Sequence, residues 1–171
     1  NYEFIAEITL VQKKKIVVNI LFNRFVNRES CQKIHLVQGI SKGERMEIVV
    51  QKAIELGVSS ITPIITARCA VKLDTARKEK KRLQWQAIAV AACEQSGRNQ
   101  LPKIHPIVSF SEYLAKKHEG LNLALNPIAT TRWRDICVVN QEVRLLVGPE
   151  GGLDEDELNL LNANKFLFLQ L

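Results

Sequence analysis

The stretch from Val143 to Leu158, VRLLVGPEGGLDEDEL, contains three features that decide the fold. Four of its first five residues are apolar and two of these are β-branched, which predicts a buried strand. In the turn GPEGG the glycines let the backbone take unusual angles and approach a ligand. Asp154 then fits a helix N-cap, with Glu157 as its capping-box partner. The pattern predicts a strand, a tight loop and a helix N-terminus, which is where α/β proteins bind ligands.

The loop does not have the sequence of a phosphate-binding loop. No GKS or GKT is present, and the glycine spacing differs from G-x-G-x-x-G. Glu150 would repel a pyrophosphate, so a ligand with hydroxyl groups or a cationic centre fits better. An ordinary strand-to-helix turn is the alternative interpretation.

The composition of the 171 residues bounds the remaining possibilities. Lys and Arg number 24 against 18 Asp and Glu, and this net charge of +6 fits a nucleic-acid partner, although solvated lysines alone often produce it. The cysteines are scattered without a zinc or disulfide pattern, which favours a reduced, cytoplasmic setting and no metal: Cys31, Cys69, Cys93 and Cys137. No membrane span or signal peptide is predicted. The chain opens inside a strand-like pattern without Met, which indicates a fragment.

Two different rhythms divide the chain near residue 34. Residues 4–10 and 16–21 predict a hairpin, and the polar segment 23–33 a linker. From residue 34, strands are expected at 34–40, 60–66, 104–108, 121–125, 143–147 and 166–171, and helices at 43–56, 74–96, 109–117 and 154–162. Pro63 suggests an end or edge position for its strand. The alternation predicts an α/β fold whose parallel sheet is covered on both faces.

Several other polar clusters are candidates for function. Lys42 and Arg45 lie near an expected helix N-terminus and contact RNA phosphates or are simply solvated. The polar segment 94–99, EQSGRN, lies at the end of a long helix. The helix either holds these side chains in place for function, or the segment is simply a frayed helix end. Arg68, near Lys72, holds a phosphate or pairs with Glu55, and the pairing is favoured.

A basic run, one tryptophan and the histidines give weaker signals. The basic residues from 77 to 82 usually indicate a solvated helix face, with specific RNA binding as the alternative. Trp85 is expected in the core rather than as a platform for a base. His35, His105 and His118 form no local pattern with Ser, Cys or Asp, so no catalytic role is assigned to them.

Four segments together resemble one family. They are SKGERME at 41–47, QKAIELGV at 51–58, ACEQSGR at 92–98 and LLVGPEGGL at 145–153. In order and spacing they resemble the ribosomal RNA small subunit methyltransferase E family of the SPOUT superfamily. The resemblance implies methylation of N3 of a uridine in 16S rRNA with S-adenosylmethionine, by a homodimer whose active site lies near the subunit interface.

The same resemblance implies a domain organisation and a cofactor site. Residues 1–22 would end a PUA-like RNA-binding barrel, 23–33 would link the domains, and 34–171 would belong to a trefoil-knotted SPOUT domain. A third cofactor loop and a final helix would follow Leu171. The implied cofactor-binding residues are Leu123, Leu125, Asn126, Pro127, Val147, Gly148, Pro149, Gly151, Gly152 and Leu169.

Catalytic and RNA-binding roles follow as expectations. Transfer of a methyl group from a sulfonium is an in-line displacement that depends on alignment and requires no metal. Glu150, Arg45 and Arg98 are the catalytic candidates, for orienting the reactants or stabilising the uracil anion. The RNA-binding candidates are Lys42, Arg45, Arg68, Lys72, Glu94, Gln95 and Arg98. A non-catalytic RNA-binding module and an α/β enzyme with a nucleotide cofactor remain the alternatives.

Overall fold

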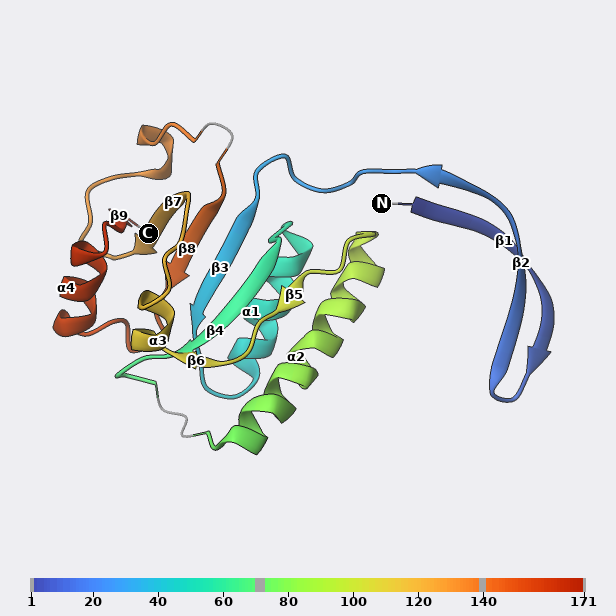
Figure 1. The fold of residues 1–171 in the computed structure, drawn as a ribbon, viewed down its shortest axis with the longest axis horizontal. Helices are drawn as coiled ribbons and strands as arrows, with labels where there is room; N and C mark the ends of the chain where they lie inside the picture. The colour runs from blue at the N-terminus through green and yellow to red at the C-terminus, as the bar shows by residue number, and fades with distance from the viewer. Residues whose placement is uncertain (1, 70–72, 139–140, 171) are drawn as a thin grey trace.

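A two-stranded hairpin precedes an α/β unit in the computed structural model, which describes residues 2–69, 73–138 and 141–170 (Figure 1). The hairpin pairs β1 (Tyr2–Gln12) with β2 (Lys15–Phe25) in antiparallel register. Both strands are longer than expected, and β2 continues into the segment predicted as a linker. Large apolar side chains on the hairpin are exposed, among them Phe4, Ile8 and Phe22.

The α/β unit is built on one seven-stranded sheet. Its strands are β3 (Ile34–Gly39), β4 (Ser60–Ile65), β5 (Lys103–Ile104), β6 (Val108–Ser109), β7 (Leu121–Leu125), β8 (Val143–Val147) and β9 (Leu167–Leu169). They are ordered β5-β4-β3-β8-β7-β9, with β6 beside β4. Every pairing is parallel, which confirms the predicted sheet, and β8 lies between β3 and β7.

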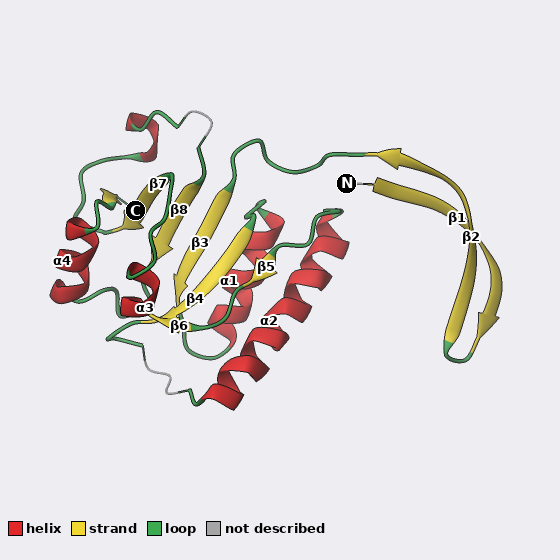
Figure 2. Ribbon diagram, in the orientation of Figure 1, coloured by secondary structure: helices red, strands yellow, loops and turns green. Residues whose placement is uncertain are grey.

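Helices cover both faces of this sheet (Figure 2). Helices α1 (Glu44–Glu55) and α2 (Thr75–Ser96) pack on one face, where Leu36 and Ile61 meet the buried Trp85. Helices α3 (Phe110–Leu114) and α4 (Glu155–Ala163) pack on the other face, against Val37 and Leu146. Neighbouring strand residues point to opposite faces, so two core layers form. The core position predicted for Trp85 is confirmed.

The predicted helix ends are largely confirmed. Asp74 caps α2 by accepting a hydrogen bond from the Arg77 N–H, and Asp154 and Glu157 form a capping box at α4. Gly57 follows the end of α1 with φ of 96°. The expected strand 104–108 is two short strands, β5 and β6, and α3 is shorter than expected. A short 3₁₀ helix, η1 (Trp133–Asp135), lies in the segment expected to be irregular.

The predicted end or edge position of the strand that contains Pro63 is wrong. Strand β4 lies inside the sheet between β3 and β5, and Pro63 is buried. The Ile61 carbonyl accepts a hydrogen bond from the His105 N–H. The backbone N–H and C=O groups of the odd-numbered residues of β4 therefore point towards the segment that contains β5 and β6. The neighbour breaks there into β5 and β6, which pair with β4 before and after Pro63. Because the ladder is interrupted, the missing N–H of proline leaves no partner unsatisfied.

None of the described helices is both long and apolar enough to cross a lipid bilayer.

Candidate active site

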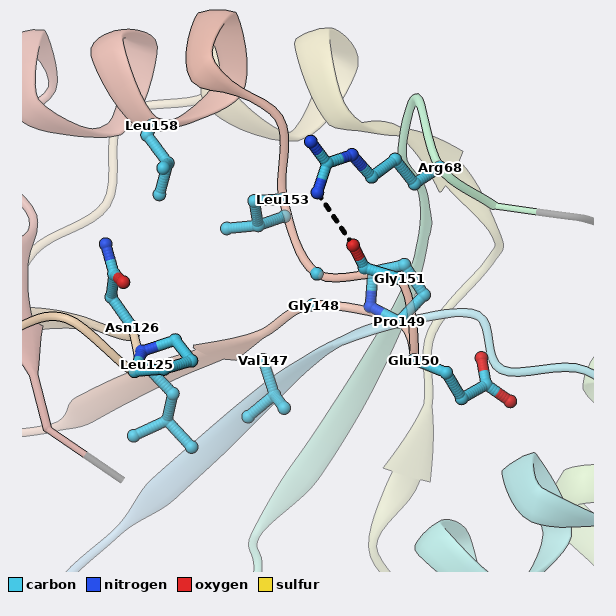
Figure 3. Close-up of a pocket in the computed structure, with 12 residues that line it drawn as sticks. Arg68, Leu125, Asn126, Val147, Gly148, Pro149, Glu150, Gly151, Leu153 and Leu158 are labelled. Carbon is cyan, nitrogen blue, oxygen red and sulfur yellow. Dashed lines mark hydrogen bonds between the residues drawn. The ribbon is translucent and has the colours of Figure 1, made fainter.

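A cavity of about 480 Å³ lies at the carboxyl ends of the sheet strands, around the loop that follows β8 (Figure 3). Its walls come from the end of β7, from the glycine loop, from the start of α4 and from Arg68 after β4. The loop is defined here as Gly148 to Gly152. The lining residues are Arg68, Leu125, Asn126, Pro127, Val147, Gly148, Pro149, Glu150, Gly151, Gly152, Leu153 and Leu158.

The backbone of the glycine loop is closely packed. Gly152 has φ of 70°, a left-handed conformation that L side chains rarely adopt. At Gly39, the last residue of β3, an added Cβ would lie 2.6 Å from Cδ of Pro149. The loop therefore rests directly on the end of β3. Sequence reasoning missed Gly39, although a glycine that ends a buried strand is a signal of close backbone approach.

Arg68 holds the glycine loop from the other side. Its Nη1 donates a hydrogen bond to the Gly151 carbonyl at 2.9 Å (Figure 3). The favoured pairing of Arg68 with Glu55 is wrong, because Glu55 accepts hydrogen bonds from Lys52 and Gln51 instead. Arg68 thus belongs to the cavity rather than to the surface of α1.

Glu157 connects the turn before Arg68 to the start of α4. Its buried carboxylate accepts a hydrogen bond from the Ala67 N–H at 2.8 Å, beside Arg68, and another from the Asp154 N–H at 3.1 Å. The capping-box signature predicted the bond between Glu157 and Asp154. The bond from the Ala67 N–H spans 90 residues and has no local sequence signal. One side chain therefore fixes both the N-terminus of α4 and the turn that carries Arg68.

Glu150 points from the loop towards α1 and away from the space between Asn126, Val147 and Leu153 (Figure 3). One carboxylate oxygen accepts hydrogen bonds from the Lys42 N–H at 3.1 Å and from Arg45 Nη1 at 3.2 Å. Its own backbone N–H, then the Lys42 N–H and Arg45, hold the pKa of Glu150 below its usual value. An ionised carboxylate in this position links the loop to the N-terminus of α1.

The structure brings most, but not all, of the expected cofactor residues together. Leu123 and Leu169 do not line the cavity, because both are buried in the apolar cluster formed by β7, β8 and β9. The other expected residues do line it: Leu125, Asn126, Pro127, Val147, Gly148, Pro149, Gly151 and Gly152. Leu153 and Leu158 join them and were missed, since an apolar residue in a helix start usually indicates core. Within the described ranges, no group of three His, Cys, Asp or Glu side chains is suited to a metal ion.

Arg98 lies elsewhere, which corrects its expected place in the active site. Helix α2 runs against the strands, so its end lies at the amino edge of the sheet (Figure 1). The Arg98 side chain is 6% exposed, pairs with Glu29 and donates to the carbonyls of Ile54 and Val58. These contacts join the linker to the end of α1. Glu94 and Gln95 are exposed at this same end of α2, and Lys72 falls outside the described residues.

Comparisons with known proteins identify the family of the chain. A model of the RNA methyltransferase domain family matches residues 28–171. Ribosomal RNA small subunit methyltransferase E of Buchnera aphidicola subsp. Schizaphis graminum is 33% identical over the whole chain and 70% of its own length. The protein of the same name from Bacillus subtilis is 31% identical over 94% of this chain, which spans 66% of that relative.

Solved structures give the same result. A methyltransferase from Legionella pneumophila, in complex with the bound cofactor SAM, is 48% identical with a TM-score of 0.94, over 100% of this chain and 71% of that one. Ribosomal RNA small subunit methyltransferase E from Neisseria gonorrhoeae, bound to S-adenosyl methionine, is 34% identical with a TM-score of 0.92, over 99% and 70% of the two chains. The chain therefore belongs to the RNA methyltransferase family, in the group of ribosomal RNA small subunit methyltransferases E.

Proposed function

We propose that this protein binds S-adenosylmethionine in the cavity of the glycine loop and methylates N3 of a uridine in 16S rRNA of the small ribosomal subunit. One observation carries the proposal: a glycine loop at the carboxyl end of the central strand β8 lines a cavity of about 480 Å³. Relatives that are 48% and 34% identical are known in complex with this cofactor. Cavities of this size are typical of sites that enclose a small ligand.

The lining residues fit the cofactor chemically. Leu125, Val147, Leu153 and Leu158 supply apolar walls suited to an adenine ring. The backbone of Gly148 to Gly152 approaches without side chains and offers amide and carbonyl groups to the polar parts. When bound, the cofactor supplies an electrophilic methyl group on a sulfonium.

The protein's own contribution is then orientation and charge. Arg68 fixes the carbonyl of Gly151, and Glu150 fixes the other side of the loop to α1, so the loop is held before any ligand arrives. A preorganised loop aligns the methyl carbon with the uracil nitrogen at little entropic cost. We assign Glu150 to orientation, because a carboxylate with a lowered pKa accepts a proton poorly.

Arg45 is the candidate for contact with the reacting uracil. Its side chain is 71% exposed, and its Nη1 lies 3.2 Å from Glu150 at the rim of the loop. A guanidinium there stabilises the negative charge that develops on uracil as the N3 proton leaves. Lys42 and Arg68 supply further positive charge for RNA phosphates.

Three further proposals concern the whole protein. The exposed apolar faces of β1 and β2 support an assignment to the end of a PUA-like RNA-binding barrel. Membership of the methyltransferase E group supports the linker and the SPOUT domain with a trefoil knot that would follow. Exposed Ile128 (84%) and Trp133 (48%), which follow Asn126 and Pro127 of the cavity, support a homodimer interface beside the active site. Four free cysteines and a ribosomal substrate support a cytoplasmic location.

Incorporation of labelled methyl groups into small ribosomal subunits tests the function. The expected result is 3-methyluridine in 16S rRNA after nuclease digestion, and at least a tenfold lower kcat for Arg45→Gln than for Arg77→Gln, a control on an exposed arginine of α2. Binding of RNA without cofactor binding or methyl incorporation would instead support the non-catalytic RNA-binding module.

A further inference from the structure

A second cavity, of about 370 Å³, lies at the opposite edge of the sheet from the glycine loop. It is formed where β3, β4 and β8 begin, on the face that carries α3. The chain has three histidines, and all three line this cavity, although they are far apart in the sequence.

The aromatic walls are held in fixed positions. Nδ1 of His35 lies 2.6 Å from Oγ of Ser60, and Nε2 lies 3.0 Å from Oγ1 of Thr62, so both ring nitrogens are engaged. The His118 ring stacks on Tyr113 at 4.6 Å and donates from Nε2 to the Tyr113 carbonyl at 3.3 Å. His105 meets His35 edge-on at 5.4 Å. These contacts fix the orientation of the three imidazole rings, as expected for the walls of a preformed binding site.

Two buried polar groups at this cavity have no hydrogen-bond partner within residues 2–69, 73–138 and 141–170. They are the hydroxyl of Tyr113, a residue that is 3% exposed, and Nη1 of Arg144, whose side chain is 11% exposed. Buried polar atoms in native proteins are almost always hydrogen-bonded, to protein, water or ligand. Both atoms are covered by neighbouring side chains, so two unpaired donors beside one cavity point to a ligand with oxygen acceptors that reaches them once the Glu142 carboxylate has moved.

The charges around the cavity favour an anion. Arg144 and Lys116 are cationic, while Glu142 is the carboxylate among the lining residues. Glu142 is 43% exposed, and its Oε2 lies 3.6 Å from Nη2 of Arg144, so the acid already occupies the position that an anionic ligand would take. The histidines are neutral at pH 7, because burial lowers the pKa of His35 to about 4 and also lowers the pKa of His105 and His118.

We infer that this cavity binds a terminal phosphate group, which displaces the Glu142 carboxylate from Arg144 and receives hydrogen bonds from Arg144 and Tyr113. A guanidinium fork matches the tetrahedral oxygens of phosphate, and a hydroxyl donor adds to it. The donors are buried, so a phosphomonoester enters more readily than a phosphate inside an RNA strand, which is esterified on two sides. Free phosphate and a 5′-nucleotide share this chemistry, and binding experiments distinguish them.

The three histidines make the cavity directly observable by NMR of their imidazole groups. Inorganic phosphate, uridine 5′-monophosphate and uridine are titrated separately into the protein, up to about ten times a millimolar Kd. We expect saturable shifts of the His105 and His118 signals with phosphate and with the nucleotide, and none with uridine. Equal affinities would identify free phosphate as the ligand, and at least tenfold tighter binding of the nucleotide would identify a nucleotide. Unchanged signals with both, or equal shifts with uridine, would overturn the inference.

Variants of the rim separate this site from general electrostatic attraction. Arg144→Gln is expected to weaken phosphate binding at least tenfold, and Lys116→Gln less. Glu142→Gln is expected to strengthen it, because the competing carboxylate is lost. Lys117→Gln is the matched control: Lys117 is exposed next to Lys116 and does not line this cavity. Equal effects of Lys116→Gln and Lys117→Gln, with no gain in Glu142→Gln, would contradict the inference even if Arg144→Gln failed to fold.

Discussion

The two edges of the sheet are built in different ways, and two arginines show the difference. At the carboxyl edge, Arg68 donates to the Gly151 carbonyl and lines the cavity of the glycine loop. At the amino edge, Arg98 is buried against Glu29 and two backbone carbonyls. From the sequence both arginines are candidates for RNA contact. Direction along the sheet therefore decides which of two similar residues lines the cavity and which joins the linker to the end of α1.

Replacement of Arg98 should produce the largest effect on stability. Arg98→Gln leaves the Glu29 carboxylate without its partner and removes donors from the carbonyls of Ile54 and Val58. Breaking a buried ion pair costs about 4 kcal/mol of unfolding free energy. Urea denaturation measures this cost, and Arg77→Gln, on an exposed arginine, should change stability by less than about 0.5 kcal/mol. A stable Arg98→Gln protein that has lost methyl transfer would restore the catalytic role expected from the sequence.

Acidification should weaken the amino edge before the carboxyl edge. The pKa of His35 falls from 6.5 to about 4 on folding, so the unfolded state binds more protons between these values. Stability should therefore fall as the pH drops from about 6.5 to 4, by about 3 kcal/mol in all. The pKa of Glu150 is lowered as well, so its contribution is lost only below its usual value of 4.5.

Denaturation curves at a series of pH values measure this dependence. His35→Asn should be less stable at pH 7 and should show a shallower fall between pH 6.5 and 4.5, since one buried neutral imidazole is removed. An unchanged slope in that variant would contradict the assignment of the acid sensitivity to His35.

Loss of Glu157 should have an intermediate effect, at the carboxyl edge. Glu157→Ala removes the hydrogen bonds that the carboxylate accepts from Ala67 and Asp154, and so weakens both the turn before Arg68 and the cap of α4. One lost cap interaction and one lost buried hydrogen bond together cost about 2 kcal/mol. Thermal denaturation of Glu155→Ala, an exposed acid of the same helical turn, provides the control. Equal destabilisation by the two variants would refute the bridging role.

The smallest effect on folding should come from Arg68. Arg68→Gln removes one exposed hydrogen bond to Gly151, so stability should change by less than about 1 kcal/mol. Affinity for S-adenosylmethionine should nevertheless fall about tenfold, equivalent to about 1.4 kcal/mol, because the loop is held less firmly. Calorimetric titration compares the two effects, and an affinity equal to that of the unaltered protein would mean that Arg68 serves RNA alone.

The sequence was sufficient for the carboxyl edge because its signals are contiguous. A strand, a glycine turn and a capping box within residues 143–158 predicted the loop, whereas Leu125, Asn126 and Pro127 beside it were expected only from the family resemblance. The parallel sheet followed from alternating elements, and the caps at Asp74 and Asp154 from local chemistry.

The amino edge could not be predicted, because tertiary contacts assemble it. His35, His105, His118 and Arg144 come from separate segments that only the strand order β4-β3-β8 brings together. The buried position of Arg98 likewise depends on α2 running against the strands (Figure 1). The prediction for the strand of Pro63 is wrong for the same reason, since the interruption between β5 and β6 is a property of the neighbouring segment.

The most direct test of the account is a titration with S-adenosylmethionine, followed by NMR of backbone amides and imidazoles in one experiment. The account predicts saturable shifts at residues 125–127 and 147–153, which line the cavity of the glycine loop, and unchanged signals from the three histidines at the other edge. Shifts of the histidine signals with an unaffected glycine loop would place the cofactor at the wrong edge and contradict the central claim.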